Sequence, residues 1–332
     1  MIQWLEDLKT APTKKAFPIL SFPCVSLLGI SVAELIKSSE QQALGMKAVA
    51  DRVDAAAAVS LMDLSVEAEC FGATVRFSDD EVPTVTGQLI SDEEGAEALV
   101  VPEVGSARSG LYIDAIRRAK ELITDRPVFA GIIGPFSLAA RLLDVSEIML
   151  FCYDDPDMVH TVLEKVTDFL IAYAKAYCEA GADGIVMAEP VSGLLSPALE
   201  EEFSSPYVKK IVDAVQNENF LVIYHNCGDN VLSMVPSILS TGASAYHFGN
   251  SISMEAMLEK TPEGTVVMGN IDPAGQFRLG TPESIRSATI ELMDKCCKHK
   301  SFVISSGCDI PPQTPWDNID AFFKAVNEFY GK

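Results

Sequence analysis

The chain has 332 residues, of which 48% are hydrophobic and 22% are charged, so it is long enough to build one large core. Its formal net charge of -22 argues against nucleic acid as a partner, because an acidic surface repels phosphate backbones. The charged start MIQWLEDLKTAPTKK and the lack of a long uncharged apolar stretch argue against a signal peptide or membrane span, so we expect a cytoplasmic protein.

Short β-rich runs alternate with longer helical patterns from residue 17 onward. Most of the short runs are unbroken apolar segments, as in parallel strands that are covered on both faces. Eight such strands predict an α/β fold of the (β/α)8 TIM barrel type, with an open doubly wound sheet as the alternative. The predicted strands are FPILSF (17–22), AAAVSLMD (56–63), VFAGII (128–133), GIVMA (184–188), FLVIYH (220–225), AYHFG (245–249), TVVMG (265–269) and FVISSG (302–307).

Two of the intervening helices have readable ends. Asp155-Pro156 places a capping residue before a proline, and Gly181 follows the last residue of the apolar stripe. Thr281-Pro282 begins a second helix in the same way. No Gly/Ser-rich linker divides the chain, so residues 1–332 are predicted to form a single domain.

Residues 64–117 do not fit a minimal barrel, because they place some fifty residues between strands two and three. The run CFGATVRFSDDEVPTVTG within them predicts a β-rich insertion over one end of the barrel. Long insertions of this kind are typical of lids and partner surfaces.

Three potential metal ligands follow predicted strands. His225 and Cys227 lie two residues apart at the end of FLVIYH, so both side chains leave the same side of an extended segment. Cys308 follows the last predicted strand, and a closed barrel brings it to the same face. One nitrogen and two sulfur ligands suit tetrahedral zinc with a fourth position open for a reactant, which is typical of a catalytic site.

Other polar residues also follow strands. Glu189 and Asp63 are candidate catalytic residues, with a salt bridge at a strand end as the structural alternative for Glu189. Asn250 and Asn270 are candidate cofactor-binding residues or simply the ends of strands, and Asp272 before Pro273 is read as a helix cap. His160 and His247 are interpreted as ordinary core or surface histidines, and the remaining cysteines as packing thiols.

Several segments together resemble the uroporphyrinogen decarboxylase superfamily, and within it the zinc- and corrinoid-dependent methyltransferases. The resemblance covers nearly the whole chain and implies a (β/α)8 barrel with zinc on His225, Cys227 and Cys308. Glu189 stands where this branch often has Asp, which leaves its role as ligand or acid open. The matching segments are DLSVEAECFGATVRF, GIIGPFSLAARL, AGADGIVMAEP, SSPYVKKIV, YHNCGD, VVMGNIDP and SSGCDIPPQTP.

The decarboxylases of this superfamily are the nearest alternative. They resemble one another in an arginine-rich segment after the first strand, where arginines bind the carboxylates of the porphyrin. Here that segment reads PCVSLLGISVAELIKS and has no arginine. The sequence therefore favours the methyltransferase branch over a decarboxylase.

The resemblance implies a zinc enzyme that moves a methyl group between a corrinoid, supplied by a partner protein, and a small substrate. A thiol acceptor such as coenzyme M is favoured because His/Cys/Cys ligation suits a thiolate. A corrinoid-dependent O-demethylase that takes the methyl group from a methyl ether or similar donor is the alternative. A homodimer is a further hypothesis.

Overall fold

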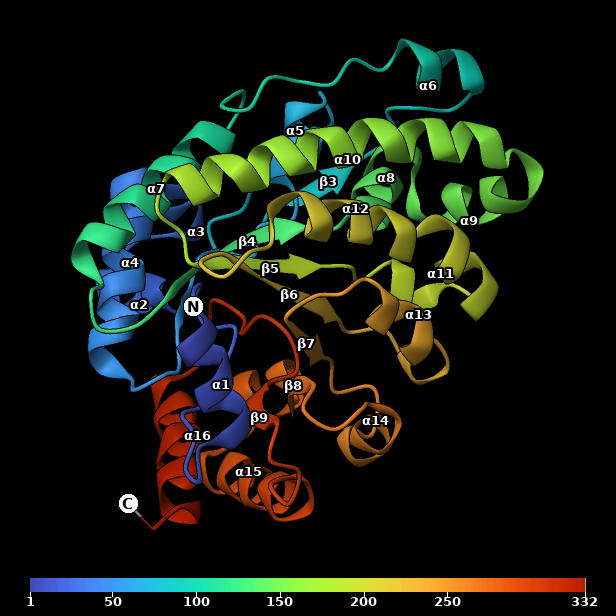
Figure 1. The fold of residues 1–332 in the computed structure, drawn as a ribbon. Coiled ribbons are helices and arrows are strands. Elements are labelled where there is room, and N and C mark those ends of the chain that lie inside the picture. Colours follow the sequence, from blue (N-terminus) through green and yellow to red (C-terminus); the bar gives the residue numbers. More distant parts are fainter. Residues whose placement is uncertain (332) are drawn as a thin grey trace.

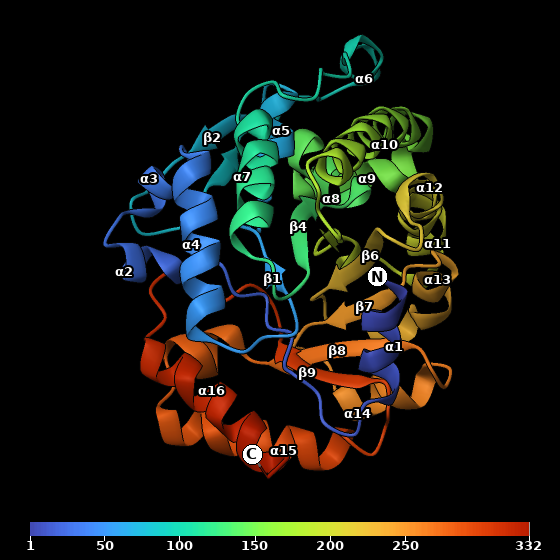
Figure 2. The same cartoon turned by 60° about the vertical axis from the view of Figure 1, so that its left-hand side comes forward.

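The computed structural model describes residues 1–331, and its main feature is a curled parallel sheet of seven strands. The strand order is β1-β4-β5-β6-β7-β8-β9, with every neighbouring pair parallel. Figures 1 and 2 show the helices on the outside of this sheet. The strands are β1 (Ala58–Val59), β4 (Val128–Ile133), β5 (Gly184–Ala188), β6 (Leu221–Asn226), β7 (Ala245–Phe248), β8 (Val266–Ile271) and β9 (Phe302–Ser306).

The outer helices follow the strands in a regular alternation, so the fold is α/β and resembles a TIM barrel. The predicted starts at Asp155-Pro156 and Thr281-Pro282 are confirmed by side-chain caps to Met158 and Ser284. The helices of the outer layer are α2 (Cys24–Leu28), α3 (Val32–Leu35), α4 (Ser39–Arg52), α7 (Ser109–Leu122), α8 (Pro135–Leu143), α9 (Val145–Asp154), α10 (Pro156–Glu179), α11 (Pro197–Phe203), α12 (Ser205–Val215), α13 (Val235–Ser240), α14 (Met254–Lys260), α15 (Pro282–Cys296) and α16 (Trp316–Phe329).

The sheet separates two hydrophobic cores. Residues such as Val222 and Tyr224 of β6 pack outward against the helices, whereas Leu221 and Ile223 of the same strand pack inside the curl. Helix α1 (Ile2–Thr10) packs against β8 and β9, and its Trp4 joins the inner core. Because both faces are buried, the strands read as unbroken apolar runs, as the sequence predicted.

The prediction of eight strands was wrong in number, because residues 17–22 do not form a regular strand. They nevertheless join the two edges of the sheet. The Phe17 amide donates to the Ile304 carbonyl at 3.0 Å, and the Ala56 amide donates to the Ala16 carbonyl at 2.8 Å. This segment therefore lies between β9 and the chain that leads into β1.

Serine hydroxyls explain why this part of the sheet is irregular. The Ile19 amide donates to the Ser306 hydroxyl at 3.0 Å, where a regular ladder would offer a backbone carbonyl. The Gly131 amide donates in the same way to the Ser60 hydroxyl at 2.9 Å, just beyond β1. Side-chain acceptors of this kind compete with the backbone ladder, so the predicted strand 56–63 shortens to two residues.

Residues 64–117 contain less β-structure than predicted. Only the antiparallel pair β2 (Thr74–Arg76) and β3 (Thr84–Thr86) is β, and both strands fall in the run CFGATVRFSDDEVPTVTG. The helices α5 (Val66–Cys70) and α6 (Glu93–Ala98) and the start of α7 also belong to this segment, and turns and irregular chain make up the rest. The term β-rich was therefore wrong, since capping residues such as Asp92 begin helices in this segment.

Buried carboxyl groups attach this segment to the sheet. Glu67 of α5 accepts a hydrogen bond from the Ile133 amide of β4 at 3.0 Å. Arg108 pairs with Asp63, which is fully buried, and with Glu69 at 2.6 Å. Breaking such a buried pair leaves an uncompensated charge and is strongly destabilising. These contacts hold the segment firmly at the carboxyl end of β1 and β4.

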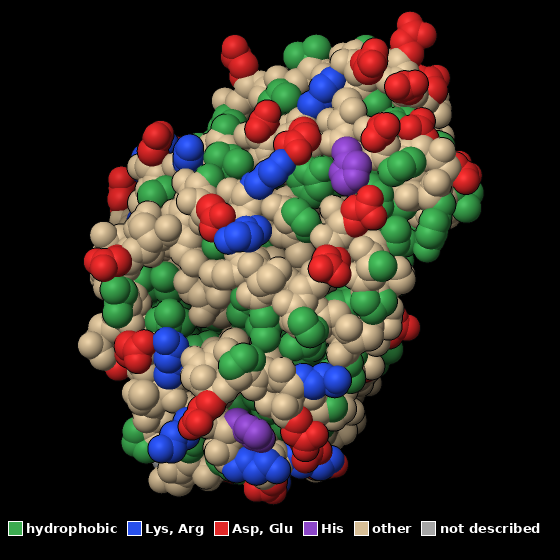
Figure 3. Space-filling view, turned by 45° about the vertical axis from the view of Figure 1, so that its right-hand side comes forward, with side chains coloured by type: hydrophobic (Ala, Val, Ile, Leu, Met, Phe, Trp, Pro, Cys, Tyr) green, Lys and Arg blue, Asp and Glu red, His purple; other side chains and the backbone are tan. Residues whose placement is uncertain are grey.

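No helix among residues 1–331 is long and apolar enough to cross a membrane. On the face seen in Figure 3, acidic side chains are spread among lysines and arginines rather than separated from a basic patch.

The stability of the protein is expected to fall as the pH rises toward 8. Burial raises the pKa of Glu67 to about 8, whereas a glutamate in the unfolded chain titrates near about 4.3. Its protonated form therefore stabilises the fold at low pH, and that contribution is lost as the pH approaches the folded pKa. Urea denaturation of Glu67→Gln should show a gain of roughly a few kcal/mol over the unsubstituted protein at pH 8.

The exposed substitution Glu97→Gln is a matched control and should leave the pH dependence unchanged. Equal dependence on pH in the unsubstituted protein and in Glu67→Gln would contradict the assignment.

Candidate metal centre and active site

The inward-facing row of the sheet changes from apolar to polar at its carboxyl end. In β6, Leu221 and Ile223 belong to the inner core, and His225 is the next residue of the same row. His225 is paired in register with His247 of β7. Because side chains alternate between the two faces of a strand, both imidazoles point into the curl.

His225, Cys227 and Cys308 meet at this end of the sheet. Their ligand atoms all lie within 4.8 Å of one another, and the Cys308 sulfur is 3.5 Å from His225 Nε2. Tetrahedral zinc with bonds of about 2.3 Å to sulfur and about 2.0 Å to nitrogen would place these two atoms roughly 3.5 Å apart. The three residues are therefore spaced as one zinc ion requires, and a tetrahedral ion held by them would have a fourth position for a reactant.

Close backbone contacts position the two cysteines. Gly249, at the end of β7, lies so near that a Cβ there would come within 2.5 Å of the Cys227 Cα. The Ser251 hydroxyl donates to the Cys227 carbonyl at 2.9 Å. Before Cys308, the Gly307 amide donates to the Ile271 carbonyl at 2.6 Å. Both ligand loops are thus fixed by the neighbouring strand ends.

A chain of hydrogen bonds sets the tautomer of His225. The Ser305 hydroxyl donates to the Phe17 carbonyl at 2.5 Å, so its oxygen accepts from His247 Nε2 at 2.7 Å. The His247 Nδ1 atom then carries no proton and accepts from His225 Nδ1 at 2.8 Å. This leaves the lone pair of His225 on Nε2, the atom that faces Cys308.

The electrostatics of the site agree with this arrangement. Burial lowers the pKa of His247 well below its ordinary value, and the neighbouring His225 lowers it further, so His247 is neutral. Contact with Cys308 lowers the pKa of Cys227, with His225 as a further cause, and the same contact raises the pKa of Cys308. One thiolate is therefore already favoured before a metal binds.

The three ligands open into a cavity of about 270 Å³ with mostly apolar walls. Its lining residues are Ile19, Met62, Leu64, Val82, Ala188, Pro190, His225, Cys227, Cys308, Asp309, Pro311 and Pro312. Apolar pockets with a few converging polar groups are the usual form of ligand sites. This cavity is our candidate active site.

The two predicted catalytic carboxylates lie beside this cavity but do not line it. Glu189 is fully buried and accepts hydrogen bonds from the Phe136 amide at 2.8 Å and from the amide and hydroxyl of Ser137 at 2.9 and 2.7 Å. It thus anchors the first turn of α8. Asp63 accepts from the Tyr112 hydroxyl at 2.6 Å and pairs with Arg108. A catalytic role for either residue stays a prediction.

The two predicted asparagines lie near the ligand loops. Asn270 donates to the Gly249 and Ile252 carbonyls at 2.8 and 3.0 Å, so it braces the loop after β7. Asn250 is exposed, and its side chain lies against Gly307, where a Cβ would come within 2.7 Å of the asparagine oxygen. Neither lines the cavity, and their role in cofactor binding stays a prediction.

Sequence reasoning missed His247 as part of the site. It interpreted His247 as an ordinary core residue, but the structure joins it to His225. The available signal was its place near the end of a predicted strand, next in order to the strand that ends at His225. Recognising the pair needs the register between β6 and β7, which the sequence alone does not supply.

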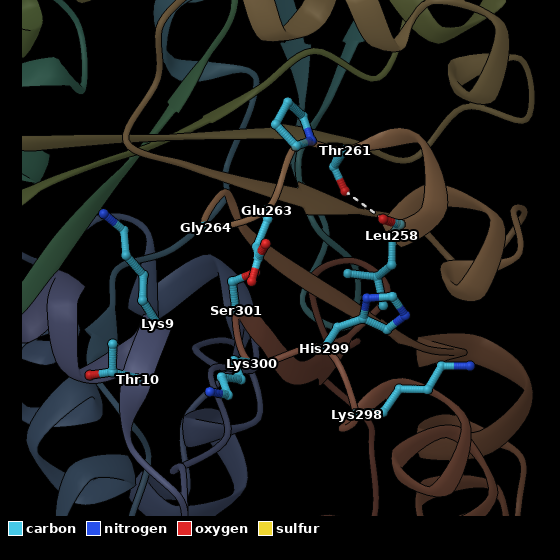
Figure 4. Close-up of a pocket in the computed structure, with 11 residues that line it drawn as sticks. Lys9, Thr10, Leu258, Thr261, Glu263, Gly264, Lys298, His299, Lys300 and Ser301 are labelled. Carbon is cyan, nitrogen blue, oxygen red and sulfur yellow. Dashed lines mark hydrogen bonds between the residues drawn. The ribbon is translucent and has the colours of Figure 1, made fainter.

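A second cavity, of about 540 Å³, lies at the opposite end of the sheet, where helices lead into β8 and β9. Figure 4 shows its basic side chains Lys9, Lys298 and Lys300 together with Glu263 and His299. It has no cysteine in its lining, and it lies away from the strand ends that carry active sites in barrels. It is therefore a weaker candidate than the cavity beside Cys227.

Comparison with known proteins places the chain in a family. The model of the family "Uroporphyrinogen decarboxylase (URO-D)" matches residues 24–329. The chain belongs to the uroporphyrinogen decarboxylase family. The family resemblance inferred from the sequence is thereby confirmed. Some of the proteins that match this chain are named methyltransferases.

Relatives with different activities in their names are about equally similar to this member of the family. "Methylcobamide:CoM methyltransferase MtbA" of Methanosarcina acetivorans is 29% identical over 274 residues, which cover 80% of this chain and 78% of that protein. "Uroporphyrinogen decarboxylase" of Coxiella burnetii is 28% identical over 285 residues, covering 82% and 77%. A solved "methyltransferase from Methanosarcina mazei" shares the fold with a TM-score of 0.87 at 24% identity over 98% of both chains.

Removing either thiol ligand should remove the metal. We expect zinc-loaded protein to hold about one zinc ion per chain, and Cys227→Ala and Cys308→Ala to hold little, because two ligands bind zinc much more weakly than three. Elemental analysis after dialysis measures this, with circular dichroism as a check of the fold. Cys178→Ala, at an exposed cysteine, is the matched control. Full zinc in both ligand variants would refute the site.

His247→Ala should weaken zinc binding without removing a ligand. Loss of the acceptor for His225 Nδ1 frees the imidazole to change tautomer, and loss of such partners costs roughly 10- to 100-fold in metal affinity. Competition with a chromophoric chelator measures the change. His160→Ala is the control, because His160 hydrogen-bonds Tyr207 and none of the three ligands, and it should leave the zinc affinity unchanged. Equal losses of affinity in both variants would contradict the role of His247 in fixing His225.

Proposed function

We propose that this protein is a zinc-dependent methyltransferase that moves a methyl group between the corrinoid of a partner protein and a small substrate, in the first place a thiol. The observation that carries the proposal is the convergence of His225, Cys227 and Cys308 at the cavity. Zinc held there would act as a Lewis acid that favours the thiolate form of the substrate.

The residues of the chain prepare the site for this reaction. Neutral His247 fixes His225, and the two cysteine ligands donate enough charge to keep a substrate sulfur nucleophilic. The apolar walls formed by residues such as Ile19, Met62 and Leu64 exclude water. In the transfer, the cobalt–carbon bond breaks with its electron pair left on cobalt, a sulfur–carbon bond forms, and the thiol proton leaves.

Transfer in the opposite sense, from a methyl ether or similar donor to the corrinoid, uses the same centre. It is the alternative within this proposal, and the thiol is preferred because a centre of one imidazole and two thiolates suits a sulfur ligand.

Decarboxylation of a porphyrinogen is the second alternative, and identity to relatives does not decide against it. Two features of the chain argue against it. The segment PCVSLLGISVAELIKS forms α2 and α3 without any arginine to bind carboxylates. The cavity of about 270 Å³ is at the small end of ordinary ligand pockets, and its lining, among the described residues, has no lysine or arginine to pair with the many carboxylates of such a substrate.

The proposal extends to the architecture. Residues 16–19, which hydrogen-bond to both edges of the sheet, take the place of an eighth barrel strand within a single domain. Residues 64–117 form an insertion that covers the cavity, because Leu64 and Val82 from this segment line it. The insertion would then act as part of a lid over the bound substrate. Assembly into a homodimer and a cytoplasmic location stay predictions.

The corrinoid partner needs a docking surface near the cavity. Leu279 and Leu194 are 77% and 58% exposed, and they follow β8 and β5 respectively, at the carboxyl ends of the sheet. Exposed apolar side chains around an active site are typical of partner contacts. We therefore expect the partner to approach this end of the sheet.

The decisive experiment mixes zinc-loaded protein with methylcobalamin and a panel of thiols and follows the cobalt absorbance. Demethylation should depend on zinc and fall by roughly 100-fold or more in Cys308→Ala. Leu279→Glu should lower the rate with a methylated corrinoid protein and leave the rate with free methylcobalamin unchanged. Decarboxylation of uroporphyrinogen without any turnover of cobalt would refute the proposal.

A further inference from the structure

The walls of the active-site cavity carry no positively charged side chain among the residues that the structure describes. Its twelve lining residues include neither lysine nor arginine, and Asp309 is the acidic one. One oxygen of Asp309 is buried without a hydrogen-bond partner. The polar groups that a bound substrate meets are thus the metal ligands and a carboxyl group.

Two arginines close to the cavity walls share their surroundings with acidic residues. Arg108 is held by Asp63 and Glu69 behind the cavity wall. Arg278 lines an adjoining space of about 560 Å³ that shares Val82 with the cavity, but Asp80 and Glu81 line the same space. A substrate anion therefore meets more negative than positive charge along this route.

The metal centre itself does not supply the missing charge. A zinc ion with two thiolates and a neutral imidazole has no net charge, since the two negative ligands cancel the two positive charges of the ion. An anionic group on the remote end of the substrate would lose its hydration in an apolar cavity without gaining an ion pair, which is unfavourable.

We propose, as an extension of the methyltransferase function above, that the non-reacting part of the substrate is uncharged or cationic and that the cavity rejects an anionic one. Coenzyme M, which appears in the name of a relative, carries a sulfonate and therefore belongs to the rejected class. The substrate class is then a small apolar or amine-bearing thiol or methyl donor, within a cavity of about 270 Å³.

Three thiols of similar size that differ in the charge of the remote group test this inference. They are 2-mercaptoethanesulfonate, 2-mercaptoethanol and cysteamine. Protein loaded with Co²⁺ in place of zinc reports thiolate binding through its sulfur-to-cobalt absorption, without any corrinoid. We expect the sulfonate to bind at least about 10-fold more weakly than both others. Equal or tighter binding of the sulfonate would overturn the proposal.

A charge added to the wall should reverse the preference. Val82→Lys is expected to improve sulfonate binding by about 10-fold, whereas Val82→Gln, of similar length and no charge, should not. Arg278→Gln should leave sulfonate binding unchanged. A loss in Arg278→Gln would mean that Arg278 already binds anions and would contradict the inference.

The outcomes separate this inference from the proposed function. Preference for the sulfonate together with zinc-dependent demethylation of methylcobalamin would overturn the charge rule alone. If the three thiols bind in the expected order but methylcobalamin is not demethylated, the methyltransferase proposal is overturned. The inference that the cavity rejects anionic groups would then still stand. Failure of all three thiols to bind the metal-loaded protein would overturn both.

Discussion

The candidate site depends on one constraint, the alternation of side chains along parallel strands inside a curled sheet. On each strand, the side chains that point into the curl must be apolar near α1, which closes the inner core. They can be polar only at the open, carboxyl end of the strands. In β6 the row changes from Ile223 to His225 within a single step of two residues. Because neighbouring strands share this rule, His247 and Ser305 arrive at the same level and meet there.

How much of this could be predicted differs from element to element. His225, Cys227 and Cys308 could be identified because their chemistry is specific and each follows a strand that reads clearly. The irregular segment 16–19 could not, because it depends on whether a hydroxyl such as that of Ser306 replaces a carbonyl in the ladder. The position of Glu189 after a strand predicts an active-site acid, and its hydrogen bonds to the first turn of α8 could not be predicted from the sequence.

The chain is strongly acidic, yet the carboxyl groups that shape the site are buried and matched in different ways. Glu189 is satisfied by the first turn of a helix, Asp63 by an arginine and a tyrosine, and Glu67 by a backbone amide and a proton. None of these groups projects into the cavity, so the acidic composition does not carry over to its walls, where Asp309 is the exception.

The hydrogen-bond chain from His225 through His247 and Ser305 ends on the carbonyl of Phe17. The centre therefore needs residues from near the start of the chain and from Cys308 near its end at the same time. During synthesis on a ribosome, the complete ligand set cannot exist until the last strand has left the exit tunnel. A metal ion held by these three ligands would therefore require the segment at Phe17 and the strand β9 to be packed together first.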